Sequence, residues 1–443
     1  MALQAPPAET ARRWRRRPDQ VLRWMSGRRA LLSVVLSAAL GLLAALGQLT
    51  SLGPLTVRHG PAGWWIFLAF ALPQGWAMSV MTYSLLRPAL IGGSGRSAVI
   101  GRWLRWSTLF ALLVQQVPAL YYAHRLDSLQ LSGWLVLLIG LELVGRAPAR
   151  LHQALQRLLA RQAIGPAQGV EDLLRALPRT GHSWSVVSGW CVAGALLITS
   201  PSTLLTASLR SSTVGPAASD LALLIVAGAV AGSWLGRMAG YGRLLNSALR
   251  KQEVHLRVIL SHPDGAGGLK PIGDFHLYQS LTASLPAIFL AVWVLLISLG
   301  GANRLWGGYR PYLDQYLWLL PLAMLFEIVV FAVPMNAVHV IMRRQKEEVF
   351  LPEADGLSPA IVAAQASVAL RASQAEGEPE AARQRLALLI EHYQELENAP
   401  TWPVDSSIRR RFTWRNLGLL VPFAGYIVGH QSFWQQISDV FKG

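Results

Sequence analysis

The stretch closest to a chemical motif is the eight-residue sequence HPDGAGGL, which runs from His262 to Leu269. It places three glycines after a single carboxylate. Glycine-rich backbone can turn several N–H groups to one side, and such groups bind a phosphate or a carboxylate. If the loop binds an anion, the predicted ligand-binding residues are His262, Asp264, Gly265, Gly267 and Gly268.

Two other interpretations of this loop stay open from the sequence. Histidines and carboxylates surround it, and both are zinc ligands in sites that activate water. The candidate metal ligands are His255, His262, Asp264, Asp274 and His276. Alternatively, the loop is a tight turn in which Asp264 caps backbone N–H groups and the glycines adopt positive φ. The spacing fits neither the Walker nor the dinucleotide pattern, so no cofactor is predicted.

Acids within apolar segments are the second kind of candidate. Glu327 lies deep in one apolar run, and Glu142 lies one helical turn before Arg146. An ionised carboxylate at mid-bilayer costs about 2.5–3.5 kcal/mol or more, so it normally faces a protein interior or a water-filled path. The residues predicted to line such a transport path are Glu142, Glu327, Gln115 and Gln116. The alternative is a structural carboxylate that is protonated or neutralised by a neighbouring helix.

The composition predicts an all-α protein that crosses a membrane several times. Hydrophobic residues make up 52% of the chain and charged residues 14%, whereas soluble domains have about a quarter of their residues charged. The net charge of +16 would also suit a nucleic-acid partner, but the basic residues lie at the ends of apolar runs. There they set membrane topology, so the expected partner is the lipid bilayer and not nucleic acid. The single cysteine, Cys191, excludes a disulfide framework.

About eight apolar runs are candidate membrane spans. The first follows an arginine-rich segment as a signal peptide would, but its length of about 20 residues is that of an uncleaved span. The runs cover Ala30–Leu49, Ala62–Leu86, Trp103–Tyr122, Leu131–Leu143, Trp184–Leu205, Leu221–Gly240, Leu281–Leu299 and Tyr316–Val340.

Basic residues alternate between the connecting loops. The loops after the second, fourth and sixth runs are rich in arginine, whereas the other loops are short and poor in charge. Cytoplasmic loops carry the excess of Lys and Arg, so the N-terminus and the end of the eighth run are predicted to be cytoplasmic. The predicted organisation is a basic cytoplasmic N-terminus (1–29), a four-helix membrane half (30–148), a cytoplasmic amphipathic connector (149–183), a second half (184–342) with a cytoplasmic loop (241–280), a cytoplasmic helical tail (343–411) and a C-terminal segment (412–443).

Three of these segments need further interpretation. In the connector, Leu151, Leu155, Leu158 and Leu159 share a helical face, which suits either a helix on the membrane surface or a connector packed on the bundle. The pattern of the tail predicts two helices, Ser358–Ser373 and Glu378–Leu396, that form a hairpin. This hairpin is a candidate surface for homo-oligomer assembly. The last segment is favoured as interfacial or re-entrant over a ninth crossing.

The two membrane halves share an order of residues that predicts a repeat. The later half has Asp314, Glu327, Pro334, His339 and Arg343, and the earlier half has Asp127, Glu142, Pro148, His152 and Arg157. Each half has four helices and begins inside, so a 4+4 repeat would be parallel, with its pseudo-twofold axis along the membrane normal.

Two short motifs carry a resemblance. HPDGAGGL, followed by two apolar helices, and PTWPVD, from Pro400 to Asp405, resemble the HPDxAGGL and P-x-WP-x-D motifs of uncharacterised bacterial multi-pass membrane proteins. The likeness covers about Glu253 to Phe412. It implies a bacterial inner-membrane location and no activity. Because both motifs fall on the predicted cytoplasmic side, we expect the segment from Glu253 to His276 to be ordered and to pack against the tail around Trp402.

The sequence favours a channel or transporter, because polar groups lie within the spans and the soluble segments carry little that suits catalysis. A membrane-embedded sensor or effector that binds a ligand at the cytoplasmic loop is the alternative. A membrane enzyme acting on a phosphate-containing substrate through His262 and Asp264 comes third, so an enzyme is the less favoured class.

The alternation of arginine predicts that reporter fusions after Arg96, Gly165 and Lys270 all give a cytoplasmic signal. Paired alkaline phosphatase and fluorescent-protein fusions measure this. A periplasmic signal at any one of the three positions would contradict the eight-span topology.

Overall fold

The computed structural model describes residues 35, 37–39, 41–42, 65, 72–73, 75–83, 96–123, 128–199, 214–260, 262–298, 312–374 and 379–429. These residues are mostly helical, as predicted. The only strands among them are β1 (Ile164–Gly165) and β2 (His255–Leu256), which pair antiparallel.

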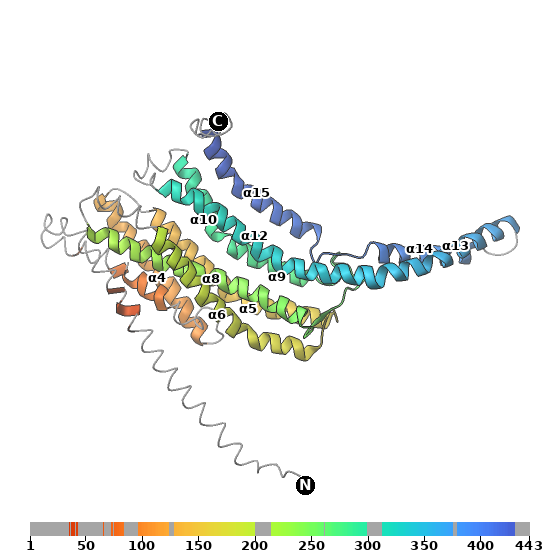
Figure 1. The fold of residues 1–443 in the computed structure, drawn as a ribbon. Coiled ribbons are helices and arrows are strands. Elements are labelled where there is room, and N and C mark those ends of the chain that lie inside the picture. Colours follow the sequence, from red (N-terminus) through yellow and green to blue (C-terminus); the bar gives the residue numbers. More distant parts are fainter. Residues whose placement is uncertain are drawn as a thin grey trace, which may run out of the picture. The chain divides into compact units, whose positions relative to one another are not determined.

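Ten α-helices fill most of the described chain (Figure 1). They are α4 (Arg96–Ala123), α5 (Ser128–Ala160), α6 (Ala167–Thr199), α8 (Val214–Arg250), α9 (Lys270–Ala283), α10 (Leu285–Ser298), α12 (Tyr312–Gln345), α13 (Leu351–Gln374), α14 (Pro379–Glu397) and α15 (Ser406–Gly429). A π-helical segment, η1 (Lys346–Phe350), joins α12 to α13.

Two helices in the described part are long and apolar enough to cross a membrane. One covers Leu131–Ala160, and the other covers Tyr316–Leu370 without a break. The pair α9 and α10, which meet at a bend of 42°, makes a third if the two together form one span. The first two predicted spans, Ala30–Leu49 and Ala62–Leu86, lie largely outside the described residues. The finding fits a membrane protein, and the number of eight spans stays a prediction.

The described helices belong to two compact units. Unit 1 contains residues 1–145 and 186–234, and unit 2 contains residues 146–185 and 235–443. The boundaries between the units fall within α5, α6 and α8: those at 145/146 and 185/186 lie within three residues of the ends of the predicted connector, and the third, at 234/235, lies inside the predicted second half. The predicted repeat is not tested by this division and stays a prediction.

The predicted connector is not a separate helix. Its first part continues α5 and its last part begins α6, and between them lies a short turn that includes β1. Leu151, Leu155 and Leu158 of its apolar face are buried within the protein. This burial favours the connector packed on the bundle over a helix on the membrane surface.

The tail contains a helical hairpin in unit 2. α12 continues through η1 into α13, and α14 packs back along α13 (Figure 1). Ala364 of α13 and Ala382 of α14 are buried, and Leu386, Leu389 and Ile390 are half-buried. The small alanines permit close packing of the two helices, while the hairpin leaves Val362, Leu370 and Leu388 exposed.

The C-terminal segment is a continuous helix as far as Gly429. α15 packs along α10 and also touches α9. A re-entrant segment would reverse direction, and the described part of this segment, up to Gly429, does not. Residues 430–443 lie outside the described residues, so the expectation of an interfacial or re-entrant segment over 412–443 stays a prediction.

Leu155 of α5 is fully buried, and the adjacent Gln156 is exposed. Removing a buried leucine side chain loses its packing and leaves a cavity, which costs about 2–5 kcal/mol. We expect Leu155→Ala to lower the melting temperature of the purified protein clearly, and Gln156→Ala to leave it nearly unchanged. Equal melting temperatures for the two variants would contradict the burial of the connector.

Candidate functional site

The HPDGAGGL loop folds around its own aspartate. Asp264 Oδ1 accepts hydrogen bonds from the N–H groups of Ala266 and Gly268, each at 3.0 Å. The Asp264 N–H in turn donates to His262 Nδ1 at 3.2 Å. Gly265, Gly267 and Gly268 have φ of +62°, +61° and +82°, which only glycine adopts readily. The loop thus has the conformation that the turn interpretation requires.

An arginine from outside the motif completes this turn. Arg161, at the end of α5, donates from Nη1 to Asp264 Oδ2 at 2.9 Å and to the Gly268 carbonyl at 3.1 Å. Burial acts to raise the pKa of Asp264, but the N–H groups of Gly268 and Ala266 and the nearby His262 outweigh it, so the pKa is lowered. The Ala266 and Gly268 N–H groups, which an anion cradle would use, are therefore occupied by a carboxylate of the chain itself.

The second resemblance motif packs directly on this loop. A Cβ on Gly267 would lie 3.2 Å from Pro400 Cγ, and a Cβ on Gly273 would lie 2.2 Å from the Pro403 carbonyl oxygen. Lys270 Nζ and Asp405 Oδ2 form an ion pair at 2.6 Å. The sequence predicts that the HPDGAGGL loop packs against the PTWPVD segment. The contacts above confirm that packing. We call residues 254–270 together with 399–405 the clasp.

α12 holds both parts of the clasp. The His339 ring stacks on Trp402 with ring centroids 4.0 Å apart, and His339 Nδ1 lies 2.6 Å from the Thr401 carbonyl oxygen. Gln345 accepts from the Val258 N–H at 3.1 Å and donates to the Leu256 carbonyl at 2.5 Å. The long helix is thereby tied to the loop and to the PTWPVD segment.

The candidate metal ligands do not form one cluster: His262 Nδ1 and Asp264 Oδ1 lie 3.1 Å apart, but the other three lie elsewhere. His255 is exposed on β2, Asp274 is exposed on α9, and His276 is fully buried with Nδ1 2.6 Å from Gln279 Oε1. Within the described ranges, no group of three His, Cys, Asp or Glu side chains could hold a metal ion. The ligand set His255, His262, Asp264, Asp274 and His276 is therefore corrected, because the turn of the loop and the helix α9 direct these side chains to different places.

The intramembrane acid Glu327 forms an ion pair that the sequence did not reveal. Glu327 is fully buried on α12 and pairs with Arg415 of α15. Ser280 of α9 donates to Glu327 Oε1 at 3.1 Å and also receives a hydrogen bond from Arg415. Arg415 lies in the apolar run 412–428. A basic residue in such a run indicates that a buried acidic side chain pairs with it, and this was the sequence feature that could have predicted the pair.

α9 and its C-terminal cap add further buried polar groups to this pair. Gln279 donates from Nε2 to the Met238 carbonyl at 2.8 Å and lies beside His276. His276, Gln279, Ser280, Thr282 and Ser284 are all fully buried. Eight buried polar side-chain atoms have no hydrogen-bond partner among the described residues, and four of them belong to this region, namely His276 Nε2, Glu327 Oε2, Arg415 Nε and Asn416 Oδ1. Donors and acceptors of this kind can bind water, an ion or a small polar solute.

The other predicted path residues lie in unit 1. Glu142 forms an ion pair with Arg105 of α4 at 2.5 Å and is half-buried. The side chains of Gln115 and Gln116 lie outside the described part of the structure. We therefore define the candidate site by the buried polar cluster of unit 2, which consists of Glu327, Arg415, Ser280, Gln279 and His276.

No protein-family model, no curated protein and no solved structure matches this chain. The interpretation of the site therefore depends on the geometry.

Burial acts to raise the pKa of Asp405, but Lys270, the Ile408 N–H and the Ser407 hydroxyl outweigh it and lower the pKa well below its usual range. A carboxylate with a lowered folded-state pKa stabilises the fold above its unfolded pKa of about 3.9, and that contribution is lost as the pH falls through the folded value. The pKa of Asp264 is also lowered, so its contribution to stability is likewise lost as the pH falls. We expect Asp405→Asn to melt at a lower temperature near neutral pH and to lose less stability on acidification than the unchanged protein.

Thermal unfolding measured at about pH 7 and about pH 4 checks this expectation. Asp355→Asn, which changes an exposed aspartate of the hairpin, is the matched control. An Asp405→Asn protein with the melting profile of the unchanged protein at both pH values would show that the Lys270 pair does not stabilise the clasp.

Proposed function

We propose that the protein is a transporter or channel of the bacterial inner membrane, with about eight spans and a cytoplasmic N-terminus. The observation that carries the proposal is the buried polar cluster around Glu327 and Arg415, which lies beside the bend between α9 and α10. The lipid bilayer is the expected surrounding. The parallel 4+4 repeat remains part of the proposal.

The cost of burying these groups supports a functional role. Ionisable residues in membrane segments are expensive, and they commonly mark ion or substrate pathways. Broken helices in transporters place polar backbone and side chains at the binding site. α9 and α10 form such a bent pair, and the buried polar groups of α9 and its cap end at the bend with Ser280 and Ser284.

The ion pair between Glu327 and Arg415 corresponds to a closed state of the proposed path. Glu327 is fully buried, and the guanidinium of Arg415 occupies the position beside its carboxylate. A solute or ion reaches Glu327 only when Arg415 is displaced. Because Arg415 is carried by α15, a movement of α15 against α9 and α12 would open the site.

A membrane-embedded sensor or effector is the second candidate, and one specific observation favours it. The helix from Tyr316 to Leu370 runs 55 residues without a break, so it joins the segment that holds Glu327 to the hairpin of α13 and α14. A ligand or partner at the clasp or the hairpin would act on Glu327 through this helix. Ligand-dependent thermal shift of the purified protein tests this candidate.

Two further proposals remain from the sequence. Homo-oligomer assembly through the hairpin is tested by the mass of the purified protein with and without Leu388→Glu, a change at an exposed leucine. A membrane enzyme that uses His262 and Asp264 on a phosphate-containing substrate is tested by loss of a hydrolytic activity in His262→Ala.

For transport, we expect purified protein in liposomes to pass potassium, chloride or protons, and Glu327→Gln to change that flux by about tenfold. Such a change corresponds to 1.4 kcal/mol in the energy of the path, which is less than the cost of an intramembrane charge. Flux is measured with ion-sensitive and pH-sensitive dyes. Glu347→Gln, at an exposed position where α12 ends, is the matched control.

Glu327→Gln leaves Arg415 buried without its counter-charge, which can cost about 3–5 kcal/mol. The double variant Glu327→Gln/Arg415→Gln removes both charges and separates a folding defect from a transport defect. Unchanged flux in the double variant, together with an altered melting temperature, would make the pair solely structural. A lack of flux in the unchanged protein would overturn the transport proposal.

A further inference from the structure

Three helices of unit 2 bring basic side chains to one place on its surface. Arg161, which follows α5 directly, donates to the Gly268 carbonyl just before α9 at 3.1 Å, and a Cβ on Gly273 of α9 would lie 3.3 Å from Ile408 Cδ1 of α15. Arg157 lies one turn before Arg161 and Arg411 lies one turn after Ile408, so both reach the part of α9 that carries Lys270 and the exposed Asp274. These three segments lie more than a hundred positions apart in the chain. The fold therefore gathers a basic surface that no single stretch of sequence contains.

A second arginine of α5 extends this surface along α9. The guanidinium of Arg150 lies over the Tyr278 ring, 4.2 Å from its centroid. Arg150 precedes Arg157 by about two helical turns, and Tyr278 follows Asp274 by about one turn. The two arginines therefore lie along the same side of α5, beside α9.

α15 adds three consecutive exposed arginines, Arg409, Arg410 and Arg411. Lys270 is engaged by Asp405, whose Oδ1 also caps α15 by accepting the Ile408 N–H at 2.8 Å. We call Arg150, Arg157, Arg409, Arg410 and Arg411 the arginine surface. Two described carboxylates, Asp274 and the Asp405 that pairs with Lys270, lie at this surface beside the five exposed arginines, so its charge stays positive.

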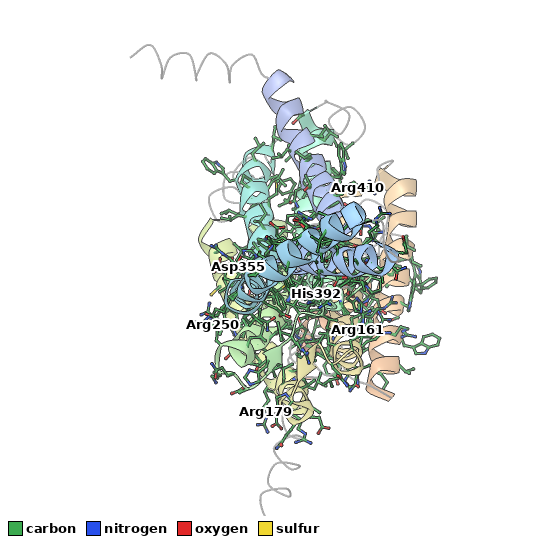
Figure 2. The ribbon with its side chains drawn as sticks, turned by 90° about the vertical axis from the view of Figure 1, so that its right-hand side faces the viewer. Arg161, Arg179, Arg250, Asp355, His392 and Arg410 are labelled. Carbon is green, nitrogen blue, oxygen red and sulfur yellow. The ribbon has the colours of Figure 1, made fainter. Side chains whose placement is uncertain are left out.

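Figure 2 looks at unit 2 from the end that carries the hairpin. The labelled arginines Arg161, Arg179, Arg250 and Arg410 lie around the outside of this end, and Asp355 and His392 lie on the hairpin among them. Basic groups thus mark this end as a whole. The arginine surface is the part of it that adjoins the apolar helices α9 and α15.

The side chains next to the arginine surface indicate where the membrane begins. After Arg411, α15 exposes Trp414, Leu417 and Val421 at helical spacing, while Leu419 faces the protein. Trp402, just before α15, is also exposed. Tryptophan concentrates at the boundary between water and lipid. An apolar stripe that starts one turn after three arginines places those arginines at the depth of lipid headgroups.

We propose that Arg150, Arg157 and Arg411 bind the phosphate of an anionic phospholipid headgroup. Charge complementarity favours an anion, and guanidinium groups bind phosphate oxygens through paired hydrogen bonds. The position beside a lipid-facing stripe favours a lipid over a soluble anion, because the acyl chains then lie along Trp414 and Leu417.

A headgroup in this site would connect α5 to α15. α15 carries Arg415, four residues after Arg411, to Glu327. A bound lipid therefore fixes the helix that covers the buried pair. The lipid site itself does not depend on the transport proposal, because its test measures binding and not flux.

The test uses the full-length protein in nanodiscs of phosphatidylcholine, with and without phosphatidylglycerol. We expect phosphatidylglycerol to raise the melting temperature of the unchanged protein and to remain bound in native mass spectrometry. Each basic residue near a membrane surface contributes about 1 kcal/mol to anionic-lipid binding, so Arg157→Gln/Arg411→Gln should weaken retention of phosphatidylglycerol about 30-fold. Arg157→Lys/Arg411→Lys should retain part of the binding.

Arg383→Gln/Arg385→Gln, at exposed positions of α14 on the hairpin, is the matched control and should bind lipid as the unchanged protein does. Melting in pure phosphatidylcholine reports whether each variant folds. Equal lipid retention by the Arg157/Arg411 variant and the control would overturn the proposal. A melting shift of the same size with inorganic phosphate in pure phosphatidylcholine would also overturn it, since the site would then take a soluble anion.

Discussion

The ion pair between Glu327 and Arg415 is the interaction on which the arrangement of unit 2 depends. A single buried charge is costly, and breaking a buried pair costs about 3–5 kcal/mol because the remaining charge lacks compensation. α9, α12 and α15 therefore have to meet at one depth, where Ser280 bonds to both partners. This requirement makes α15 part of the packed helices. The ion pair between Lys270 and Asp405 fixes the start of the same helix from the clasp.

The clasp shows how a sequence that resembles a ligand-binding loop serves architecture. The carboxylate of Asp264 takes the place that an anion would occupy, and Arg161 balances its charge. Gly267 and Gly273 allow the backbone to approach Val258 and Pro403 more closely than any side chain would permit. His339 and Gln345 then tie the clasp to α12. The chemistry suited to a site lies instead in the buried polar cluster, which draws on three helices.

The helix from Tyr316 to Leu370 joins these regions mechanically. It contains Glu327 in its apolar part, contacts the clasp through His339 and Gln345, and ends in the hairpin with α14. These three points therefore lie on one helical segment. The arginine surface adds a fourth point of control, because Arg411 and Arg415 lie one turn apart on α15. Transport and signalling would both use this connection.

The sequence by itself determined the local properties of the chain. Apolar composition and periodicity predicted helices and membrane character, the glycines after Asp264 predicted a turn with positive φ, and the two resemblance motifs predicted the packing of the clasp. These properties depend on neighbouring residues or on side-chain chemistry. Only the tertiary structure decided that Arg415 pairs with Glu327 across 88 positions, and that the candidate metal ligands do not gather into one group of three or more. It also decided that the connector leucines face protein. Such pairings depend on which helices are adjacent, and neither hydropathy nor spacing along one chain specifies that adjacency.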